Sequence, residues 1–235
     1  MKILITGTSS GLGFGLASYY LSEGHTVYGI SRRSNKKLDH FHNFSFLSQD
    51  VSDFKNLGMN LATFLKRTEN LDLVILNAGM LNEIKDLKDT SLDEIEKVMN
   101  VNVWANKVII DTLLSEMDYV SQVVAISSGA AVSGARGWNA YSLSKATLNM
   151  LVKLYANEQT KTHFCALAPG LIDSAMQEYV SGLPDDPQYP VITRLKEVRA
   201  SGKMPGIEEA AKTTALAIKK VRSHESGSFL DVRKM

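Results

Sequence analysis

Short apolar runs alternate along the chain with longer segments in which apolar residues recur every three or four positions. The runs lie at Ile3–Ile5, Val27–Ile30, Phe44–Leu47, Leu71–Leu76, Val123–Ile126 and His163–Leu167. Short runs that are apolar at nearly every position are typical of strands buried on both faces of a parallel sheet. Parallel neighbours need crossover helices, so the pattern predicts an α/β fold. We expect a Rossmann-like, doubly wound parallel sheet of about seven strands with helices on both faces.

The helical segments are predicted at about Leu12–Ser22, Phe54–Arg67, Ser91–Met117, Asn139–Gln159 and Ile207–Val221. Ser91 followed three residues later by Glu94 fits a capping box at the start of the third segment. This segment is long enough for one long helix or for two helices with a break near Asn100–Asn102.

The prolines are unevenly distributed. All five lie between Pro169 and Pro205. Because proline fixes φ and lacks a donor, this stretch is predicted to be an irregular excursion from a regular fold. Long loops in compact domains are usually lids or binding segments, so we expect a substrate lid at about 171–205, with a disordered linker as the alternative. The chain is otherwise expected to be one domain over 1–235.

Composition narrows the class of protein. The 235 residues are 44% hydrophobic and 22% charged, which excludes collagen-like and largely disordered chains. A net charge of +1 gives no reason to expect binding to nucleic acid or to an anionic membrane. The single Cys165 offers no internal disulfide, and no apolar run approaches the ~18 residues of a membrane span. The stretch before Gly7 is too short for a signal peptide, so a soluble, cytoplasmic protein is expected.

A glycine-rich turn joins the first predicted strand to the first helix. Gly7, Gly11 and Gly13 give the spacing G-x-x-x-G-x-G. Glycines allow a sharp turn and a close backbone approach, and a helix N-terminus presents free N–H groups to a phosphate. The turn therefore predicts a nucleotide site, although a tight turn without a ligand remains the alternative.

Tyr141 and Lys145 are four residues apart on a predicted helix, so their side chains share one face. A nearby ammonium stabilises a phenolate and lowers the pKa of a tyrosine, which could then exchange a proton at neutral pH. A surface helix pair is the bland alternative. Ser128 ends the fifth predicted strand, where its hydroxyl could hold a substrate oxygen. Ser127 competes with it for this role.

Together these segments resemble the short-chain dehydrogenases/reductases, in particular their small single-domain members. The resemblance covers essentially the whole chain and rests on Thr6–Gly13, Asp50-Val51, Leu76–Gly79, Asn102, Ser127-Ser128, Tyr141–Lys145 and Pro169-Gly170. It implies an oxidoreductase that interconverts a carbonyl and a secondary alcohol with a nicotinamide cofactor. Epimerases and dehydratases with the same pair are one alternative, and an NADP(H)-binding redox sensor without turnover is another.

The resemblance also implies roles for particular residues. The catalytic set would be Asn102, Ser128, Tyr141 and Lys145, with Asn102 bending a helix and holding a water that links Lys145 to solvent. Asn100 is the alternative to Asn102, and Ser174 stands where the family more often has threonine. The implied cofactor contacts are Gly7, Ser9, Ser10, Gly11, Leu12, Gly13, Ser31, Arg32, Arg33, Asp50, Val51, Asn77, Ala78, Gly79, Tyr141, Lys145, Pro169, Gly170, Ile172 and Ser174.

The second strand indicates which cofactor is preferred. It ends Ile30-Ser31-Arg32-Arg33, with no acidic residue before Asp39. A carboxylate at this point would favour NAD, whereas arginine matches the oxygens of a phosphate. We expect NADP(H) to be preferred, with Arg32 the larger contributor and NAD(H) still possible. Solvated loop charges are the alternative.

Other chemistry has weaker support. The His40/His42 and His163/Cys165 pairs have no clear third ligand, so no metal site is expected. No G-x-S-x-G nucleophile elbow is present, which argues against a Ser-His-Asp hydrolase.

The substrate pocket is expected to include Met80, Leu81, Gly134–Trp138 and Leu171–Tyr189. The helices at 102–117 and 139–159 are apolar on more than one face, as in helices buried on both sides. This pattern, together with the usual assembly of the family, predicts a homodimer or homotetramer acting on a small carbonyl or alcohol.

Overall fold

The computed structural model describes all 235 residues and contains the predicted parallel sheet. Its seven strands run in the order β3-β2-β1-β5-β7-β8-β9, and every neighbouring pair is parallel. The strands are β1 Lys2–Thr6, β2 Thr26–Ser31, β3 Phe44–Ser48, β5 Leu73–Leu76, β7 Gln122–Ile126, β8 His163–Ala168 and β9 Ser228–Asp231. Two short strands, β4 Asn70–Leu71 and β6 Tyr119–Val120, pair separately. The doubly wound α/β prediction is confirmed.

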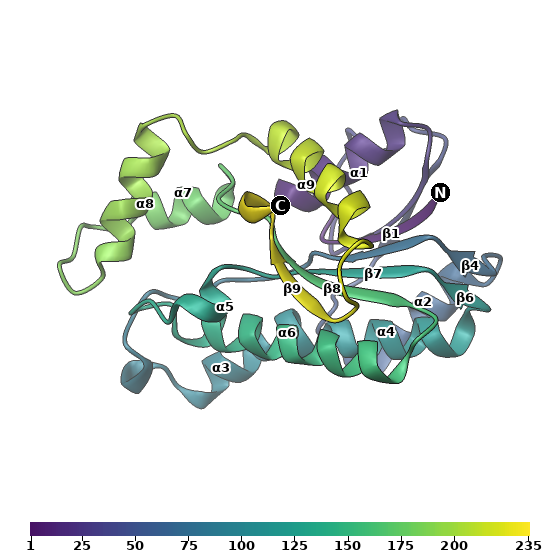
Figure 1. Cartoon of the computed structure of the whole chain (residues 1–235), viewed down its shortest axis with the longest axis horizontal. Helices are drawn as coiled ribbons and strands as arrows, with labels where there is room; N and C mark the ends of the chain where they lie inside the picture. Colours follow the sequence, from purple (N-terminus) through teal and green to yellow (C-terminus); the bar gives the residue numbers. More distant parts are fainter.

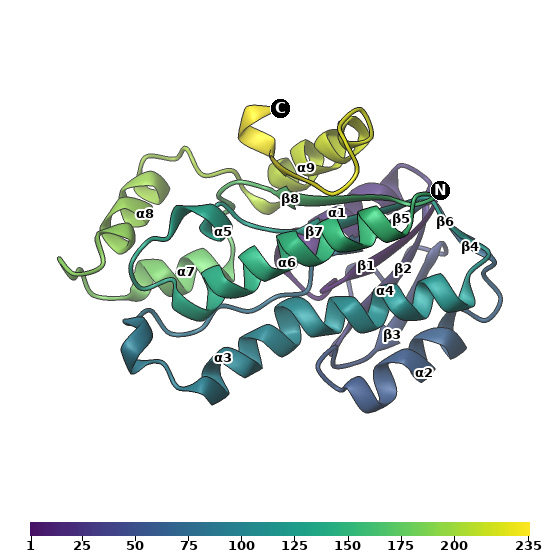
Figure 2. The ribbon, with the colours of Figure 1, turned by 60° about the horizontal axis from the view of Figure 1, so that its bottom comes forward.

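The helices cover both faces of this sheet. They are α1 Gly11–Ser22, α2 Phe54–Leu65, α3 Leu92–Met99, α4 Ala105–Glu116, α5 Ala130–Ser133, α6 Asn139–Glu158, α7 Ala175–Gly182, α8 Pro190–Ala200 and α9 Ile207–Val221. Helices α1 and α9 lie on one face, and α2, α4 and α6 lie on the other (Figures 1 and 2). Helices α7 and α8 project beyond one end of the sheet, close to α5 (Figure 1).

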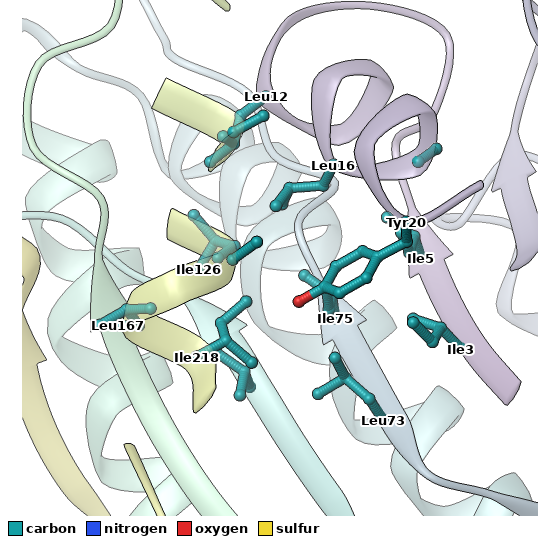
Figure 3. Close-up of a cluster of buried hydrophobic side chains, with 14 of the residues drawn as sticks. Ile3, Ile5, Leu12, Leu16, Tyr20, Leu73, Ile75, Ile126, Leu167 and Ile218 are labelled. Atoms are coloured by element: carbon teal, nitrogen blue, oxygen red, sulfur yellow. The ribbon is translucent and has the colours of Figure 1, made fainter. Parts of the chain in front are cut away.

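The strand pattern explains why the core divides into two layers. Along β1, Ile3 and Ile5 enter the core under α1 and α9, while Leu4 enters the core under α2, α4 and α6. This alternation is the two-residue period of a strand, and both faces are apolar because both are covered. Figure 3 shows the ring of Tyr20 lying among Ile3, Ile5 and other aliphatic side chains of the first layer.

The long third helical segment is broken, as one of the two alternatives predicted. Helix α3 is joined to α4 by a π-helical turn over Asn100–Trp104. The capping box of Ser91 and Glu94 is also confirmed, with both of its reciprocal hydrogen bonds formed. π-turns are frequent at functional sites, and this one buries the side chain of Asn102 completely.

Three expectations about local structure were wrong or incomplete. Residues 169–205 are not irregular, because they contain α7 and α8. Pro190 occupies the first turn of α8, where a missing N–H removes no hydrogen bond. The run Leu71–Leu76 is interrupted at Asp72, whose carboxylate instead accepts a hydrogen bond from the N–H of Lys2 at 2.6 Å. The sequence also gave no clear signal for β9, which is short and only half-buried.

Candidate active site

A cavity of about 1100 Å³ opens at the carboxyl ends of the strands. The strand order reverses between β1 and β5, and open α/β sheets bind ligands outside the strand ends at such a reversal. Nearly all the residues implied as cofactor or catalytic contacts line this cavity. The exceptions are Gly13, Arg33 and Asn102.

The glycine-rich turn closes one side of the cavity. Gly7 and Gly11 have φ of 77° and 57°, conformations that glycine adopts without strain. A Cβ on Gly13 would overlap the carbonyl oxygen of Gly7 and the side-chain amide of Asn77. Gly13 is therefore required for the close packing of α1 on this turn. It packs behind residues that line the cavity without lining the cavity itself.

Thr6 and Asn77 join the ends of the two strands that flank the reversal. The Thr6 hydroxyl accepts hydrogen bonds from the N–H groups of Asn77 and Ala78, each at 2.9 Å. The Asn77 side chain donates back to the Thr6 carbonyl at 3.0 Å. These bonds hold Asn77, Ala78 and Gly79 along the cavity wall, so the segment is more than a turn that ends a strand.

The far end of the cavity carries Arg32 and Asp50. Hydrogen bonds from the N–H and hydroxyl of Ser52 lower the pKa of Asp50, and the guanidinium of Arg32 adds to this effect. Ser31 donates its hydroxyl to the carbonyl of Arg33 at 2.9 Å. Both arginines were implied as cofactor contacts. In the structure Arg32 lines the cavity, whereas Arg33 does not.

Tyr141 and Ser128 meet at the other end. Burial raises the pKa of Tyr141, and the side chain of Ser128 opposes this with a smaller, lowering effect. The Ser127 hydroxyl is occupied elsewhere, since it donates to Asn149 Oδ1 at 2.6 Å. Of the two serines considered from the sequence, Ser128 is therefore the one whose side chain affects the pKa of Tyr141.

Lys145 lies beside Tyr141, as their spacing predicted. Lys145 is only 4% exposed, and its Nζ donates to the Ile126 carbonyl at 2.7 Å. Burial lowers the pKa of Lys145 to about 8. The Nζ atom lies 5.7 Å from the centre of the Tyr141 ring. Burial raises the pKa of Tyr141, and Lys145 is not among the groups that shift it in this arrangement; the lowering of this pKa by Lys145 stays a prediction.

Gly79 makes room for Lys145. A Cβ at this position would lie 3.6 Å from the Lys145 Nζ and 3.3 Å from Asn102 Oδ1. The small residue thus lets the end of β5 approach the two polar side chains that come from the π-turn and from α6.

The amide of Asn102 is fully engaged by the protein. Its Oδ1 accepts from the Met80 N–H at 2.8 Å, and its Nδ2 donates to the Met80 carbonyl at 3.0 Å and to Ser144 Oγ at 2.9 Å. Asn102 therefore ties the chain after β5 to the π-turn and to α6. The water expected between Lys145 and solvent stays a prediction.

The segment 171–205, which is predicted to be a lid, packs against the end of the cavity that contains Tyr141. Its residues Val180, Ile192 and Leu195 form one apolar cluster with Trp138 and Tyr141. The segment also contributes the lining residues Leu171, Ile172, Ser174, Ala175, Met176, Gln177, Val191, Arg194 and Leu195. Of the pocket residues expected from the sequence, Met80 and Trp138 line the cavity, whereas Leu81 does not.

Several polar residues of the site were missed by the sequence reasoning. Ser144 accepts from Asn102, and Asn82 Oδ1 accepts from the Tyr141 N–H at 3.2 Å. Gln177 is 7% exposed and its Oε1 has no partner within the protein. Arg233, near the C-terminus, also lines the cavity. Of these residues, only Ser144 had a sequence signal, because it lies one residue before Lys145 in the Tyr141–Lys145 motif.

Other kinds of site find little support in the structure. No group of three or more histidine, cysteine, aspartate or glutamate side chains is placed to hold a metal ion. Cys165 is completely buried, and burial raises the pKa of its thiol to about 12. None of the helices combines the length and apolar character needed to cross a bilayer.

The parallel sheet and the glycine turn at its reversal define a Rossmann-like nucleotide-binding fold. A family model described as short chain dehydrogenase matches residues 1–182. The chain therefore belongs to the short-chain dehydrogenase family and is an oxidoreductase, as the motifs predicted.

Its relatives include named reductases. A benzil reductase ((S)-benzoin forming) of Bacillus cereus is 30% identical over 226 residues, which cover 89% of this chain and 90% of that protein. An NADPH-dependent pterin aldehyde reductase of Arabidopsis thaliana is 29% identical over 183 residues, covering 74% and 76%. Among solved structures, a short chain dehydrogenase/reductase of Saccharomyces cerevisiae (YIR035C) superposes with a TM-score of 0.86 at 23% identity, covering 98% and 95%.

Proposed function

We propose that this protein is an NADP(H)-dependent reductase that converts a small apolar ketone into a secondary alcohol, with Tyr141 as the proton donor. The observation that carries the proposal is that Ser128, Tyr141 and the buried Lys145 line one cavity together with Arg32. One cavity thus has groups suited to a nucleotide phosphate at one end and to a carbonyl oxygen at the other.

NADPH, which the glycine-rich turn and Arg32 would hold in this cavity, would supply a hydride for the carbonyl carbon. Ser128 and Tyr141 donate hydrogen bonds to the carbonyl oxygen, and Tyr141 passes its proton to that oxygen as negative charge develops there. The tyrosinate left behind lies close to the ammonium of Lys145, which is protonated below its pKa of about 8. In the direction of alcohol oxidation, the same tyrosine accepts the proton.

Asn102 is a positioning residue in this proposal. Its hydrogen bonds to Met80 and Ser144 fix the π-turn against α6, the helix that carries Tyr141 and Lys145. An Asn102→Ala variant is therefore expected to lower kcat with less effect on the affinity for NADPH.

The preference for NADP(H) is assigned to Arg32. Its guanidinium lies in the cavity, and arginine binds phosphate oxygens in a forked geometry. Thermal shifts with NADPH and NADH give the two affinities without a substrate, because a bound ligand raises the apparent stability of the folded state. Arg32→Ala is expected to reduce the NADPH/NADH affinity ratio by about 10- to 100-fold, the value of one charge-assisted hydrogen-bonded contact.

Arg33→Ala is the matched control. It removes an identical charge one residue away that is outside the cavity lining. An equal loss in both variants would mean that general charge, rather than a contact by Arg32, sets the preference. Tighter binding of NADH by the unmodified protein would overturn the assignment of the cofactor.

Aromatic ketones are the proposed substrate class, with benzil as the first compound to test. The catalytic end is mainly apolar, and the similar Bacillus cereus protein is a benzil reductase. In this chain, the apolar residues that line this end of the cavity are Met80, Ala130, Ala135, Trp138, Leu171, Met176, Val191 and Leu195. NADPH oxidation by benzil should be abolished in Tyr141→Phe while the thermal shift with NADPH is retained. Turnover that survives this substitution would refute the role of Tyr141.

We also propose that α7 and α8 act as a substrate lid and that the protein forms a homodimer or homotetramer. The helices on which the assembly prediction rested use many of their apolar residues in the monomer core. Ile109, Leu113, Leu148 and Val152 are examples. Leu143, Met150 and Leu154 of α6 remain about half exposed and support a contact there. A monomer in light scattering at micromolar concentration would contradict the assembly.

A further inference from the structure

The last residues of the chain reach the catalytic end of the cavity. After β9, a short 3-10 helix over Val232–Lys234 brings Arg233 into the cavity lining. This turn lies outside residues 1–182, which the family model matches. In Figure 1 the C-terminus lies between the lid helices and α9, at the same end of the sheet as the lid.

Two glycines locate the Arg233 side chain. Its Nη2 lies 3.5 Å from the position that a Cβ on Gly129 would occupy, and its Cγ and Cδ lie 3.5 Å from the corresponding position at Gly170. Gly129 directly follows Ser128, whose side chain affects the pKa of Tyr141. Consecutive Cα atoms are about 3.8 Å apart, so the guanidinium lies beside the backbone segment that carries Ser128.

Asp231 fixes the orientation of this guanidinium. Its carboxylate, 10% exposed, accepts from Arg233 Nε at 2.9 Å and from Nη2 at 2.5 Å, and it also accepts from the Arg233 N–H at 3.0 Å. Both side-chain bonds use one edge of the planar group. Because a guanidinium has five N–H donors, three remain free, two on Nη1 and one on Nη2.

The pair favours a neutral acceptor over an anion. Asp231 cancels most of the positive charge of Arg233, while the remaining donors stay open, since the arginine side chain is 54% exposed. Directed donors without net charge suit a carbonyl or ether oxygen. The other polar side chains that the segment 171–205 contributes to the cavity are Ser174, Gln177 and Arg194.

We propose that Arg233, held by Asp231, is a specificity-determining residue that donates hydrogen bonds to a second oxygen of the substrate, next to the carbonyl that is reduced. The enzyme then selects dicarbonyl compounds over monocarbonyl compounds of the same size. This inference rests on the proposed ketone reductase function and refines its substrate class.

The test compares two ketones that differ in one group. In 1-phenyl-1,2-propanedione a carbonyl replaces the CH₂ that lies next to the carbonyl of propiophenone. Arg233→Met is expected to lower kcat/KM for the dione by about 3- to 10-fold, mainly through KM, as for loss of one hydrogen bond whose donor charge is largely cancelled. Its effect on propiophenone should be less than about twofold.

Lys234→Met is the matched control, because Lys234 is an exposed cation on the same turn and is outside the cavity lining. Lys234→Met should leave kcat/KM unchanged for both the dione and propiophenone. Thermal melting with NADPH verifies that each variant is folded. An equal loss of kcat/KM for both ketones in Arg233→Met would show a general structural role and overturn the proposal.

Binding in the presence of NADP⁺ separates this proposal from the proposed function. The oxidised cofactor cannot reduce either ketone, so calorimetry measures affinity alone. A preference of the unmodified protein for the dione that disappears in Arg233→Met supports the role of Arg233, even if neither ketone is turned over. Equal affinities of the unmodified protein for the two ketones would overturn that role, even if both are reduced.

Discussion

Replacing Lys145 by methionine is expected to stabilise the protein at neutral pH in the absence of ligands. The Lys145 ammonium is buried at the bottom of the cavity, and its one protein hydrogen bond is to the Ile126 carbonyl at 2.7 Å. A charge that loses its hydration without gaining a counter-charge is costly. Burial lowers the pKa of Lys145 from an ordinary value of 10.5 to about 8, which expresses this cost.

The magnitude follows from that difference in pKa. The difference between the ordinary pKa of 10.5 and the pKa of about 8 in the folded protein corresponds to about 3 kcal/mol. Methionine also loses the hydrogen bond to Ile126, which costs about 1 kcal/mol. The free energy of unfolding of Lys145→Met at pH 7 should therefore exceed that of the unmodified protein by about 2 kcal/mol.

The gain should depend on pH with a defined sign. Below about pH 8, Lys145 is charged in both the folded and the unfolded state, so its full penalty is present. Between about pH 8 and pH 10.5 the folded state releases the proton first, and the penalty shrinks as the pH rises. Above this window both states are neutral, and only the lost hydrogen bond, about 1 kcal/mol against methionine, remains.

Urea unfolding of both proteins at pH 7, 8, 9 and 10 measures this difference. Lys153→Met, which removes an exposed lysine from the same helix α6, should give a difference close to zero with no comparable trend. The reasoning fails if Lys145→Met is less stable at pH 7. It also fails if a gain is present but does not change up to pH 10.

Three further substitutions have expected outcomes. Gly13→Ala should lower the free energy of unfolding by at least about 2 kcal/mol in urea and weaken NADPH binding, because the new Cβ overlaps the fixed carbonyl of Gly7. Thr214→Val should raise the melting temperature by the equivalent of about 1 kcal/mol, since its fully buried hydroxyl has no partner. Arg136→Leu should raise KM for the ketone about 3- to 10-fold with NADPH affinity unchanged, because Arg136 contacts both Asp86 and the lid residue Tyr189.

The parts of the fold that were predictable from the sequence depend on local periodicity. Helix α9 has the predicted bounds Ile207–Val221, and the break in the long helical segment falls where Asn100–Asn102 suggested it. Repeated apolar positions specify which face of an element is buried, whatever lies opposite. Strand β9 lacks such a signal, since it is four residues long and half-buried along its length.

Residues 169–205 show how a sound rule can be applied too widely. Proline is excluded from helix interiors, and this led to a prediction of irregular structure over 169–205. Pro190 instead begins α8, and four of the five prolines lie outside helices. Pro184 follows the end of α7 and Pro190 begins α8, and both positions are ones that the rule permits.

In the site, the sequence could specify which residues share a face but not which atoms they reach. The spacing of Tyr141 and Lys145 predicted neighbouring side chains, yet the Lys145 Nζ donates to the Ile126 carbonyl rather than to the phenol. The partner of Lys145 Nζ depends on where α6 crosses the end of β7 and on the space left by Gly79. The sequence of α6 alone specifies neither of these. The same holds for Arg233, which is close in space to Ser128 but about a hundred residues away in the chain. Chemistry carried by a local motif could be predicted, whereas chemistry that needs a long-range neighbour required the folded structure.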